Sequence, residues 1–304
     1  MAIKRAIEIE TLDRLAKGFQ ESRGITDKLT TEQMIAFSKE PVASGENKLG
    51  AYFDGSLTEI TAADLGDITT FRDYIIYQSG ILSLEIPSTI NKIGGSVWNA
   101  STLTTVKYDG TTNDWATKIN FTGLSHIPTS LNKVDTMWFR DNQGNYYMVD
   151  DILEFTEGIE KINNYSFYNF IRPRNLILPS SMTNIGQYAF YYCSNLVNIT
   201  LNEGLRVIQA QAFAYCDAIQ KVVIPNSVHT LGGSAFRNCQ LLNEVRIGNG
   251  IESNSVSMSS NAFANCPNLT DIYIDKPEGS VGNSPWGATN AQIHWNTPLP
   301  SKEG

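Results

Sequence analysis

The chain has 304 residues, of which 41% are hydrophobic and 18% are charged, as is typical of a folded protein. Its formal net charge is −8, and the acidic residues are scattered along the chain. A surface of this sign does not attract polyanions. The composition therefore argues against nucleic acid as a partner, and against bulk attraction to an anionic membrane.

The first ten residues do not have the pattern of a signal peptide. They contain two basic residues without an apolar run behind them, and Glu8 and Glu10 interrupt the region that such a signal needs. No stretch of the chain approaches the length that spans a membrane. We therefore expect no signal peptide, no transmembrane segment and synthesis in the cytoplasm.

Residues 1–40 show helical periodicity, with a first helix that ends near Gly24 and a second that begins at the capping box Thr30-x-x-Gln33. Two helices this short cannot bury enough surface to fold alone. We expect this segment to be an attachment anchor that docks on the solenoid, a copy of itself or another protein, followed by a polar linker at 41–55. The candidate anchor residues are Leu12, Leu15, Phe19, Met34 and Phe37.

The motif Ala-Phe-x-x-Cys occurs four times, and its phenylalanines are separated by 23, 23 and 27 residues. A recurrent step of this size is the signature of a solenoid, in which each unit packs on the next. Apolar pairs such as Val222 and Ile224 alternate with polar residues, which indicates short strands. The motif itself predicts a helical or 3₁₀ turn with the phenylalanine inward. The fold class is therefore an α/β solenoid with short strands.

Weaker copies of the unit precede the regular ones. Phe167 lies 23 residues before Phe190, and earlier units are centred on Ile76 and Trp98. These three units lack the cysteine, which predicts looser packing around them.

The register of these copies places the solenoid at residues 56–275. Its stretch 111–150 is irregular, and residues 137–148 within it have the pattern of a β-hairpin that turns at Asp141–Gly144. Residues 276–304 are expected to be a C-terminal cap and tail, since the last turn would otherwise leave an open edge.

The four cysteines, Cys193, Cys216, Cys239 and Cys266, occupy one position of the repeat. Turns stacked about 4.8 Å apart spread four thiols over roughly 14 Å, too far for one zinc ion with Zn–S distances of about 2.3 Å. Disulfides between neighbouring turns are not excluded by distance, but a cytoplasmic origin favours reduced thiols. We predict a column of buried free thiols, without metal or cofactor.

Residues suited to catalysis are scarce. The histidines are His126, His229 and His294, and no Gly-x-Ser-x-Gly, His-Glu-x-x-His or phosphate-binding glycine loop occurs. Catalytic sites need groups that converge in a cleft. We therefore expect this chain not to be an enzyme.

Binding is the better expectation, because a solenoid presents its outward residues in columns along an extended face. A second column follows the buried phenylalanines on the opposite side and is rich in tyrosine and arginine, which are typical interface anchors. Such rings also stack on sugars, although they can simply pack over neighbouring turns. The candidate ligand residues are Tyr168, Tyr191, Tyr192, Tyr215 and Arg237 in this column, and Asn198, Thr200, Lys221, Glu244, Arg246 and Tyr273 on the strands.

The units carry Ile-Pro, Ile-Gly, Ala-Phe, Cys and Leu in a constant order, as in Ile224-Pro225 and Ala235-Phe236. This pattern resembles the BspA-like class of bacterial leucine-rich repeats. The resemblance implies a leucine-rich-repeat solenoid and a role in adhesion.

The segment from Thr11 to Met34 is similar to a helical module of tail and fibre proteins from phages of Gram-positive bacteria, and 285–295 looks like a closing cap from the same setting. These resemblances imply a virion protein of the tail, baseplate or fibre. It would bind other virion proteins through 1–40, and a host cell-surface glycan or protein through the solenoid. The open alternatives are a structural or decorating virion protein, a bacterial interaction or adhesion module, and self-association into a homo-oligomer.

Overall fold

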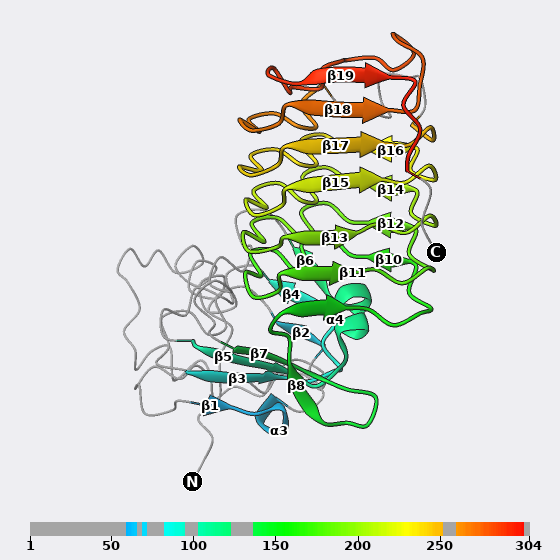
Figure 1. Cartoon of the computed structure of the whole chain (residues 1–304). Coiled ribbons are helices and arrows are strands. Elements are labelled where there is room, and N and C mark those ends of the chain that lie inside the picture. The colour runs from blue at the N-terminus through cyan, green and yellow to red at the C-terminus, as the bar shows by residue number, and fades with distance from the viewer. Residues whose placement is uncertain are drawn as a thin grey trace, which may run out of the picture. The chain divides into compact units, whose positions relative to one another are not determined.

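The computed structural model describes residues 59–65, 69–71, 82–94, 103–122, 136–251 and 260–300 (Figure 1). The chain divides into two compact units. Unit 1 comprises Met1–Gly110 and Asn120–Tyr146, and unit 2 comprises Thr111–Ile119 and Tyr147–Gly304.

Several predictions from the sequence fall outside the described residues. They concern the anchor at 1–40, the linker at 41–55 and the early units centred on Ile76 and Trp98. The anchor residues in question are Leu12, Leu15, Phe19, Met34 and Phe37.

Unit 1 contains strands from two parallel ladders. The first sheet has the order β1 (Glu59–Ile60), β3 (Ser83–Ile86), β5 (Thr105–Tyr108), β7 (Thr136–Arg140) and β8 (Tyr146–Met148), with helix α3 (Ala62–Leu65) after β1. The second has the order β2 (Thr70–Phe71), β4 (Lys92–Gly94) and β6 (Asn120–Thr122). Strands β1 to β7 therefore alternate between the two sheets along the chain, as a solenoid requires, whereas β8 follows β7 in the same sheet.

The predicted hairpin is confirmed. The amide of Asp141 donates to Asn145 O at 2.9 Å, and the amide of Gly144 donates to Asp141 O at 3.1 Å. Gly144 has a φ of 84°, a left-handed conformation that glycine adopts without strain. The Asp141 carboxylate also accepts the amides of Gln143 and Asn145, so a single aspartate holds the turn.

Unit 2 is a β-solenoid, which confirms the predicted fold class. Its front strands are β9 (Ile152–Glu154), β11 (Asn175–Ile177) and β13 (Asn198–Thr200) in one sheet, and β15 (Lys221–Ile224), β17 (Glu244–Ile247), β18 (Asp271–Ile274) and β19 (Gln292–Trp295) in another. Its back strands are β10 (Lys161–Ile162), β12 (Asn184–Ile185), β14 (Val207–Ile208) and β16 (Thr230–Leu231). Figure 1 shows the front strands stacked one above another, with back strands running behind them.

A stack of phenylalanine rings runs through the core of unit 2. Successive ring centroids lie 5.7, 5.2, 5.2 and 5.9 Å apart, and the planes differ by 18° or less. Aromatic contacts of this kind contribute about 0.5–1.5 kcal/mol each beyond the burial of their area. The repeat motif is therefore the source of a continuous core. The rings belong to Phe167, Phe190, Phe213, Phe236 and Phe263, all at most 1% exposed.

The backbone around each phenylalanine differs from the predicted helical or 3₁₀ turn. The amide of Phe213 donates to Ala235 O in the next turn, whereas the amide of Ala214 donates back to Gln211 O. Gln211 and Tyr215 have left-handed φ values of 57° and 61°. A helix cannot continue through such residues. The motif is instead a series of tight turns whose alternate amides bond the neighbouring turn.

The cysteines are free and buried, as predicted. Each thiol donates to a phenylalanine carbonyl oxygen one turn earlier, at 3.1–3.3 Å. Burial raises the pKa of Cys193 to about 12 and raises the pKa of Cys216 and Cys239 well above the usual value. These thiols are structural. In the part of the chain that the structure describes, no cluster of three or more His, Cys, Asp or Glu is placed to hold a metal ion.

The prediction of looser packing near Phe167 is wrong. Phe170 occupies the cysteine position in this turn, and its amide donates to Phe167 O as the amide of Cys193 donates to Phe190 O. Phe170 is 2% exposed, and its ring centroid lies 6.0 Å from that of Phe167. A larger apolar side chain therefore fills the space that the thiol fills elsewhere.

The short helix α4 (Thr112–Lys118) was not predicted. Its N-cap Thr111 and Asp114 form a capping box, a signal that is readable in the sequence. The helix buries Trp115, whose Nε1 donates to Ser166 O at 2.6 Å. None of the helices among the described residues is long and apolar enough to cross a membrane.

The stretch predicted as a cap contains a further paired strand, because β19 pairs in parallel with β18. Trp286 is fully buried, and the amide of Phe263 donates to its carbonyl oxygen at 3.0 Å. Its ring meets that of the half-buried Trp295 edge to face at 6.0 Å. The core thus continues beyond the last Ala-Phe-x-x-Cys motif.

Candidate ligand-binding surfaces of the solenoid

The outward face of β9, β11 and β13 carries a ladder of polar side chains in register. Asn198 Nδ2 donates to Asn175 Oδ1 at 2.7 Å, and Asn175 Nδ2 donates to Asp151 Oδ2 at 2.9 Å. Thr200 is exposed and lies opposite Ile177, which is 40% exposed. The amides in this ladder are largely engaged with each other.

The face of β15 and β17 carries a charge cluster. Lys221 Nζ lies 3.4 Å from Glu244 Oε2, and Arg246 Nε lies 2.8 Å from Glu244 Oε1. Partial burial opposes ionisation of Glu244, but the hydrogen bonds and charges of the two cations outweigh it and lower its pKa. Glu244 is therefore an anion between two cations.

This cluster continues across β18 and β19. The guanidinium of Arg246 lies 4.4 Å from the Tyr273 ring centroid. The ring of His294 also stacks on Tyr273, with centroids 4.4 Å apart and planes 13° apart. His294 Nε2 lies 2.8 Å from Asp271 Oδ1. The bonds from His294 and Thr270 lower the pKa of Asp271. The sequence identified Arg246 and Tyr273 but not His294, which lies opposite Tyr273 in the strand register.

The predicted tyrosine column forms one cluster. Tyr168 stacks on Tyr191 at 5.0 Å, and Tyr192 stacks on Tyr215 at 4.4 Å. Tyr191 meets both members of the second pair edge to face. Arg237 follows in the next turn, and its Nε is buried without a hydrogen-bond partner among the described residues.

Tyr192 and Tyr215 adopt left-handed backbone conformations, with φ values of 62° and 61°. Asparagine stands at the same place in other turns, with φ values of 59°. Asparagine tolerates this conformation, whereas most side chains lose roughly 1–2 kcal/mol in it. The turn itself therefore does not require tyrosine. The asparagines in question are Asn169, Asn238 and Asn265.

The tyrosine cluster is uncharged at neutral pH. Burial raises the pKa of Tyr168 to about 12, and it also raises the pKa of Tyr191 and Tyr192 above the usual value. Unfavourable interactions among the neighbouring phenolates act in the same direction. The cluster can therefore offer aromatic surface and neutral hydroxyl groups to a ligand.

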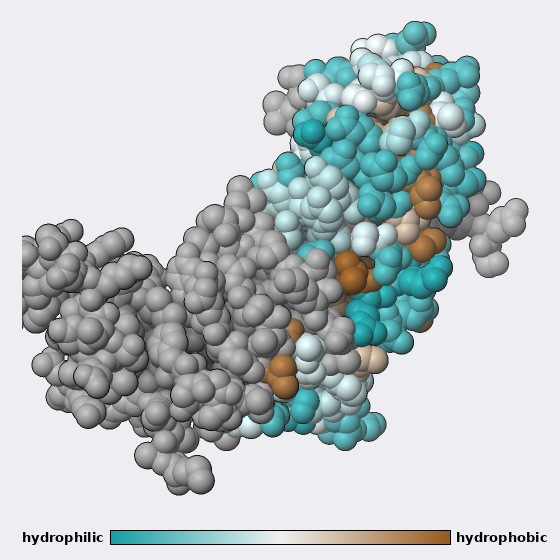
Figure 2. Space-filling model, turned by 90° about the vertical axis from the view of Figure 1, so that its left-hand side faces the viewer, coloured by the Kyte–Doolittle hydropathy of each residue, from teal (hydrophilic) through white to brown (hydrophobic). Residues whose placement is uncertain are grey.

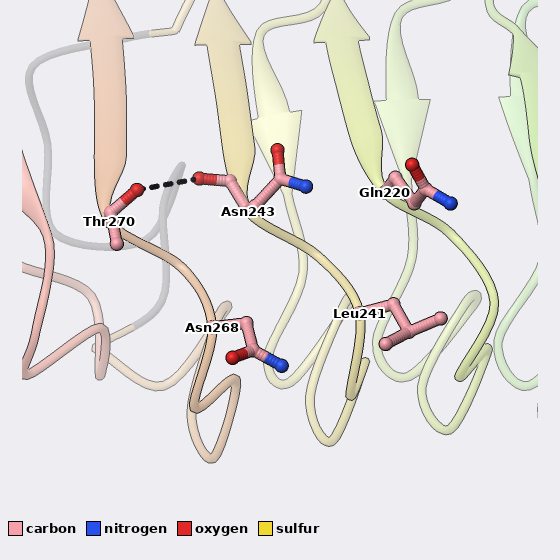
Figure 3. Close-up of a pocket in the computed structure, with 5 residues that line it drawn as sticks. All are labelled: Gln220, Leu241, Asn243, Asn268 and Thr270. Atoms are coloured by element: carbon pink, nitrogen blue, oxygen red, sulfur yellow. Dashed lines mark hydrogen bonds between the residues drawn. The ribbon is translucent and has the colours of Figure 1, made fainter.

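A shallow hollow of about 340 Å³ lies over three consecutive turns of unit 2 (Figure 3). Asn268 Nδ2 donates to Gln240 O at 2.7 Å. The Thr270 hydroxyl group lies 2.8 Å from Asp271 Oδ2 and 3.4 Å from Asn243 O. Leu241 is 49% exposed. The sequence analysis missed this site, although polar residues recur just before successive front strands. The lining residues are Gln220, Leu241, Asn243, Asn268 and Thr270.

The tyrosine cluster and the hollow lie on the same side of unit 2. Both belong to the segments that lead from a back strand to the next front strand, such as β12 to β13 and β16 to β17 (Figure 1). Figure 2 faces this side, and its coloured surface is mostly hydrophilic with small separate hydrophobic areas. This lateral side therefore combines the two sites.

Unit 1 has a cluster that the sequence analysis did not find. Tyr146 donates a hydrogen bond from its hydroxyl group to Glu85, and the Arg140 guanidinium lies 3.8 Å from the Tyr146 ring centroid. Arg140 Nε also lies 2.7 Å from Asp109 Oδ1. Burial and the bond to Glu85 raise the pKa of Tyr146. These groups satisfy one another, so the cluster serves mainly to hold the hairpin on the sheet.

These features define a leucine-rich-repeat solenoid with extended outward faces. Comparison with protein families gives a match to the BspA type leucine rich repeat region, in six copies, over residues 48–145 and 160–286. The match covers most of the chain, which therefore belongs to this family. A comparison with curated proteins gives no match.

Solved structures provide further likenesses. A leucine-rich repeat protein of T. pallidum is 23% identical, with 54% of this chain and 80% of that chain covered and a TM-score of 0.41. A leucine-rich cell surface protein of Faecalibacterium prausnitzii is 14% identical over 70% of this chain and 84% of that chain, with a TM-score of 0.43. The pneumococcal vaccine antigen PcpA is 13% identical over 79% of this chain and 77% of that chain, with a TM-score of 0.45.

Proposed function

We propose that this chain is a recognition module that attaches to a host cell-surface glycan or protein through its solenoid. The observation that carries the proposal is the alignment of outward side chains in unit 2. Residues such as Lys221, Glu244 and Asp271 lie opposite one another on successive strands. Because the phenylalanine stack and the hydrogen bonds from the thiols hold the turns together, such a surface is preorganised for an extended ligand.

Both sides of unit 2 supply groups that suit recognition. The strand face offers charged and aromatic side chains, among them Arg246 and Tyr273, and the lateral side offers the tyrosine cluster. Tyrosine and arginine are common anchors of binding surfaces. Their concentration on a rigid repeat supports binding in preference to catalysis.

We also propose that the module belongs to a phage particle, as part of the tail, baseplate or fibre. Support comes from the resemblance of the segment from Thr11 to Met34 to helical modules of such proteins. In this proposal, residues 1–40 bind other virion proteins and the solenoid faces the host. A decorating virion protein without a receptor and a bacterial adhesion module are the competing functions.

The test is the binding of the purified, fluorescently labelled full chain to a panel of Gram-positive bacterial cells. We expect saturable binding that unlabelled chain competes away. Absence of such binding to any cells would contradict host recognition and favour a decorating role. Mass spectrometry of purified phage particles tests the virion assignment separately, and a chain found only in bacterial surface fractions would favour the adhesion module.

A further inference from the structure

We infer that the hollow lined by Gln220, Leu241 and Asn243 is a binding site for a neutral saccharide chain. The inference rests on the proposed recognition function and names the ligand class. Its starting point is the chemistry of the lining, which consists of three carboxamides, one hydroxyl group and one exposed apolar side chain. Carboxamides donate and accept hydrogen bonds, which is what adjacent sugar hydroxyl groups require.

Two of the polar side chains of the hollow, Gln220 and Asn243, are available to a ligand. The side-chain amides of Gln220 and Asn243 make no hydrogen bond within the described residues, whereas Asn268 Nδ2 is bonded to Gln240 O. The backbone groups are less available for hydrogen bonds to a ligand, because Gln220 O already accepts the backbone amide of Asn243. A peptide strand therefore has no free edge to pair with here, and a ligand must bind through side chains.

The charge of the site points to a neutral ligand. None of the lining residues is ionisable. The charged residues next to the lining along the chain are Lys221, Glu244 and Asp271. Lys221 lies 3.4 Å from the Glu244 carboxylate and is therefore compensated, and the Asp271 carboxylate lies 2.8 Å from the Thr270 hydroxyl group, where it would repel an anion. A phosphate, sulfate or uronate group would have to be desolvated here without a cation of its own, which is costly.

The spacing of the polar groups also favours a saccharide over an extended peptide. Gln220 and Asn243 lie in consecutive turns, and consecutive turns are about 4.8 Å apart. An extended peptide repeats every 3.2–3.4 Å and presents alternate residues to opposite faces, so it falls out of step with the turns. Sugar rings carry hydroxyl groups around their whole edge and have apolar C–H faces. One such face can pack on Leu241, which is otherwise left 49% exposed.

The chain itself supplies replacements that remove these groups without disturbing the turns. Val197 stands one turn before Gln220, so valine at 220 and 243 fits the same backbone position. Ala218 stands one turn before Leu241 and Asn195 two turns before it. The test variants are therefore Gln220→Val with Asn243→Val, and Leu241→Ala. The matched control is Asn195→Ala, at the same repeat position outside the hollow.

The experiment measures binding of the full chain and these variants to immobilised neutral oligosaccharides, anionic oligosaccharides and unrelated peptides. We expect binding to neutral saccharides, a loss of roughly tenfold or more for the double valine variant, and a several-fold loss for Leu241→Ala. Asn195→Ala should bind as the unaltered chain does. Circular dichroism melting of each variant checks that its fold is retained.

The inference is overturned by any of three results. These are no binding to neutral saccharides, stronger binding to anionic saccharides or peptides, and neutral-saccharide binding that the hollow variants leave unchanged. A parallel assay on whole cells separates the two proposals. If the full chain binds cells and the hollow variants bind equally well, the saccharide site is wrong while host recognition stands.

Discussion

The thiol of Cys216 donates a hydrogen bond of 3.2 Å to the carbonyl oxygen of Phe190, 26 residues earlier in the chain. The same oxygen accepts the amide of Cys193 at 3.3 Å. One carbonyl group thus joins two consecutive turns. We predict that Cys216→Ala lowers the free energy of unfolding by about 1–3 kcal/mol, through a lost hydrogen bond and a small cavity.

Urea unfolding followed by circular dichroism measures this loss, with Asn195→Ala as a surface control. A Cys216→Ala variant as stable as the unaltered chain would show that the thiol bond contributes nothing.

The free energy of unfolding should fall at high pH because of the buried thiols of Cys193, Cys216 and Cys239. Burial raises the pKa of Cys193 in the folded chain from 9.0 to about 12. A raised pKa means that the folded state favours the neutral thiol, so this contribution is complete below pH 9 and is lost as the pH rises toward 12. The raised pKa values of Tyr168 and its neighbours act in the same direction.

Melting temperatures between pH 7 and 11 test this prediction, together with thiol labelling by a disulfide reagent at pH 8. We expect a falling melting temperature above pH 9 and almost no labelling of the folded chain. Rapid labelling of all four thiols at pH 8 without denaturant would contradict the buried column.

The ring of Phe213 lies between two others, 5.2 Å from Phe190 and 5.2 Å from Phe236. Phe213→Ala should therefore lower the free energy of unfolding by about 3–5 kcal/mol, because the substitution removes a fully buried ring and two aromatic contacts. Phe263, which has one ring neighbour in the stack among the described residues, provides the comparison. Phe263→Ala should lower the free energy of unfolding by less than Phe213→Ala does. An equal or larger loss for Phe263→Ala in denaturant unfolding would argue against the ring stack as the stabilising feature.

Tyr192 and Tyr215 allow function to be separated from stability. Replacing both with asparagine relieves left-handed strain of roughly 1–2 kcal/mol at each position and loses aromatic contacts of about 0.5–1.5 kcal/mol each. We therefore expect little net change in the midpoint of urea unfolding. If the cluster binds the cell surface as proposed, the double variant should bind cells several-fold more weakly.

The complementary variant Asn238→Tyr lengthens the Tyr192–Tyr215 stack by one turn and should maintain or strengthen cell binding. Unchanged cell binding by both this variant and the double asparagine variant would mean that the tyrosines only pack over the turns.

Much of the fold could be predicted because the information is local and repeated. The 23-residue step between phenylalanines and the shared cysteine position indicate stacked turns, since each apolar residue recurs where it must be buried. The hairpin at Asp141–Gly144 was predictable for the same reason, as its turn residues are adjacent. The prediction of a helical turn was wrong because nothing distinctive in the sequence marks Gln211 and Tyr215 as residues with a left-handed backbone conformation.

The candidate sites were predictable only as columns. Repeat register places Lys221 beside Glu244, but it does not say that Leu241 is left exposed. Nor does it say that the side-chain amides of Gln220 and Asn243 remain without hydrogen-bond partners among the described residues. The bond from Tyr146 to Glu85 joins residues 61 positions apart outside any regular unit. Inward residues are determined by the need for burial, which leaves a periodic trace in the sequence. Outward residues are free of that constraint, so their contacts, and the hollow among them, emerge only once the turns are stacked.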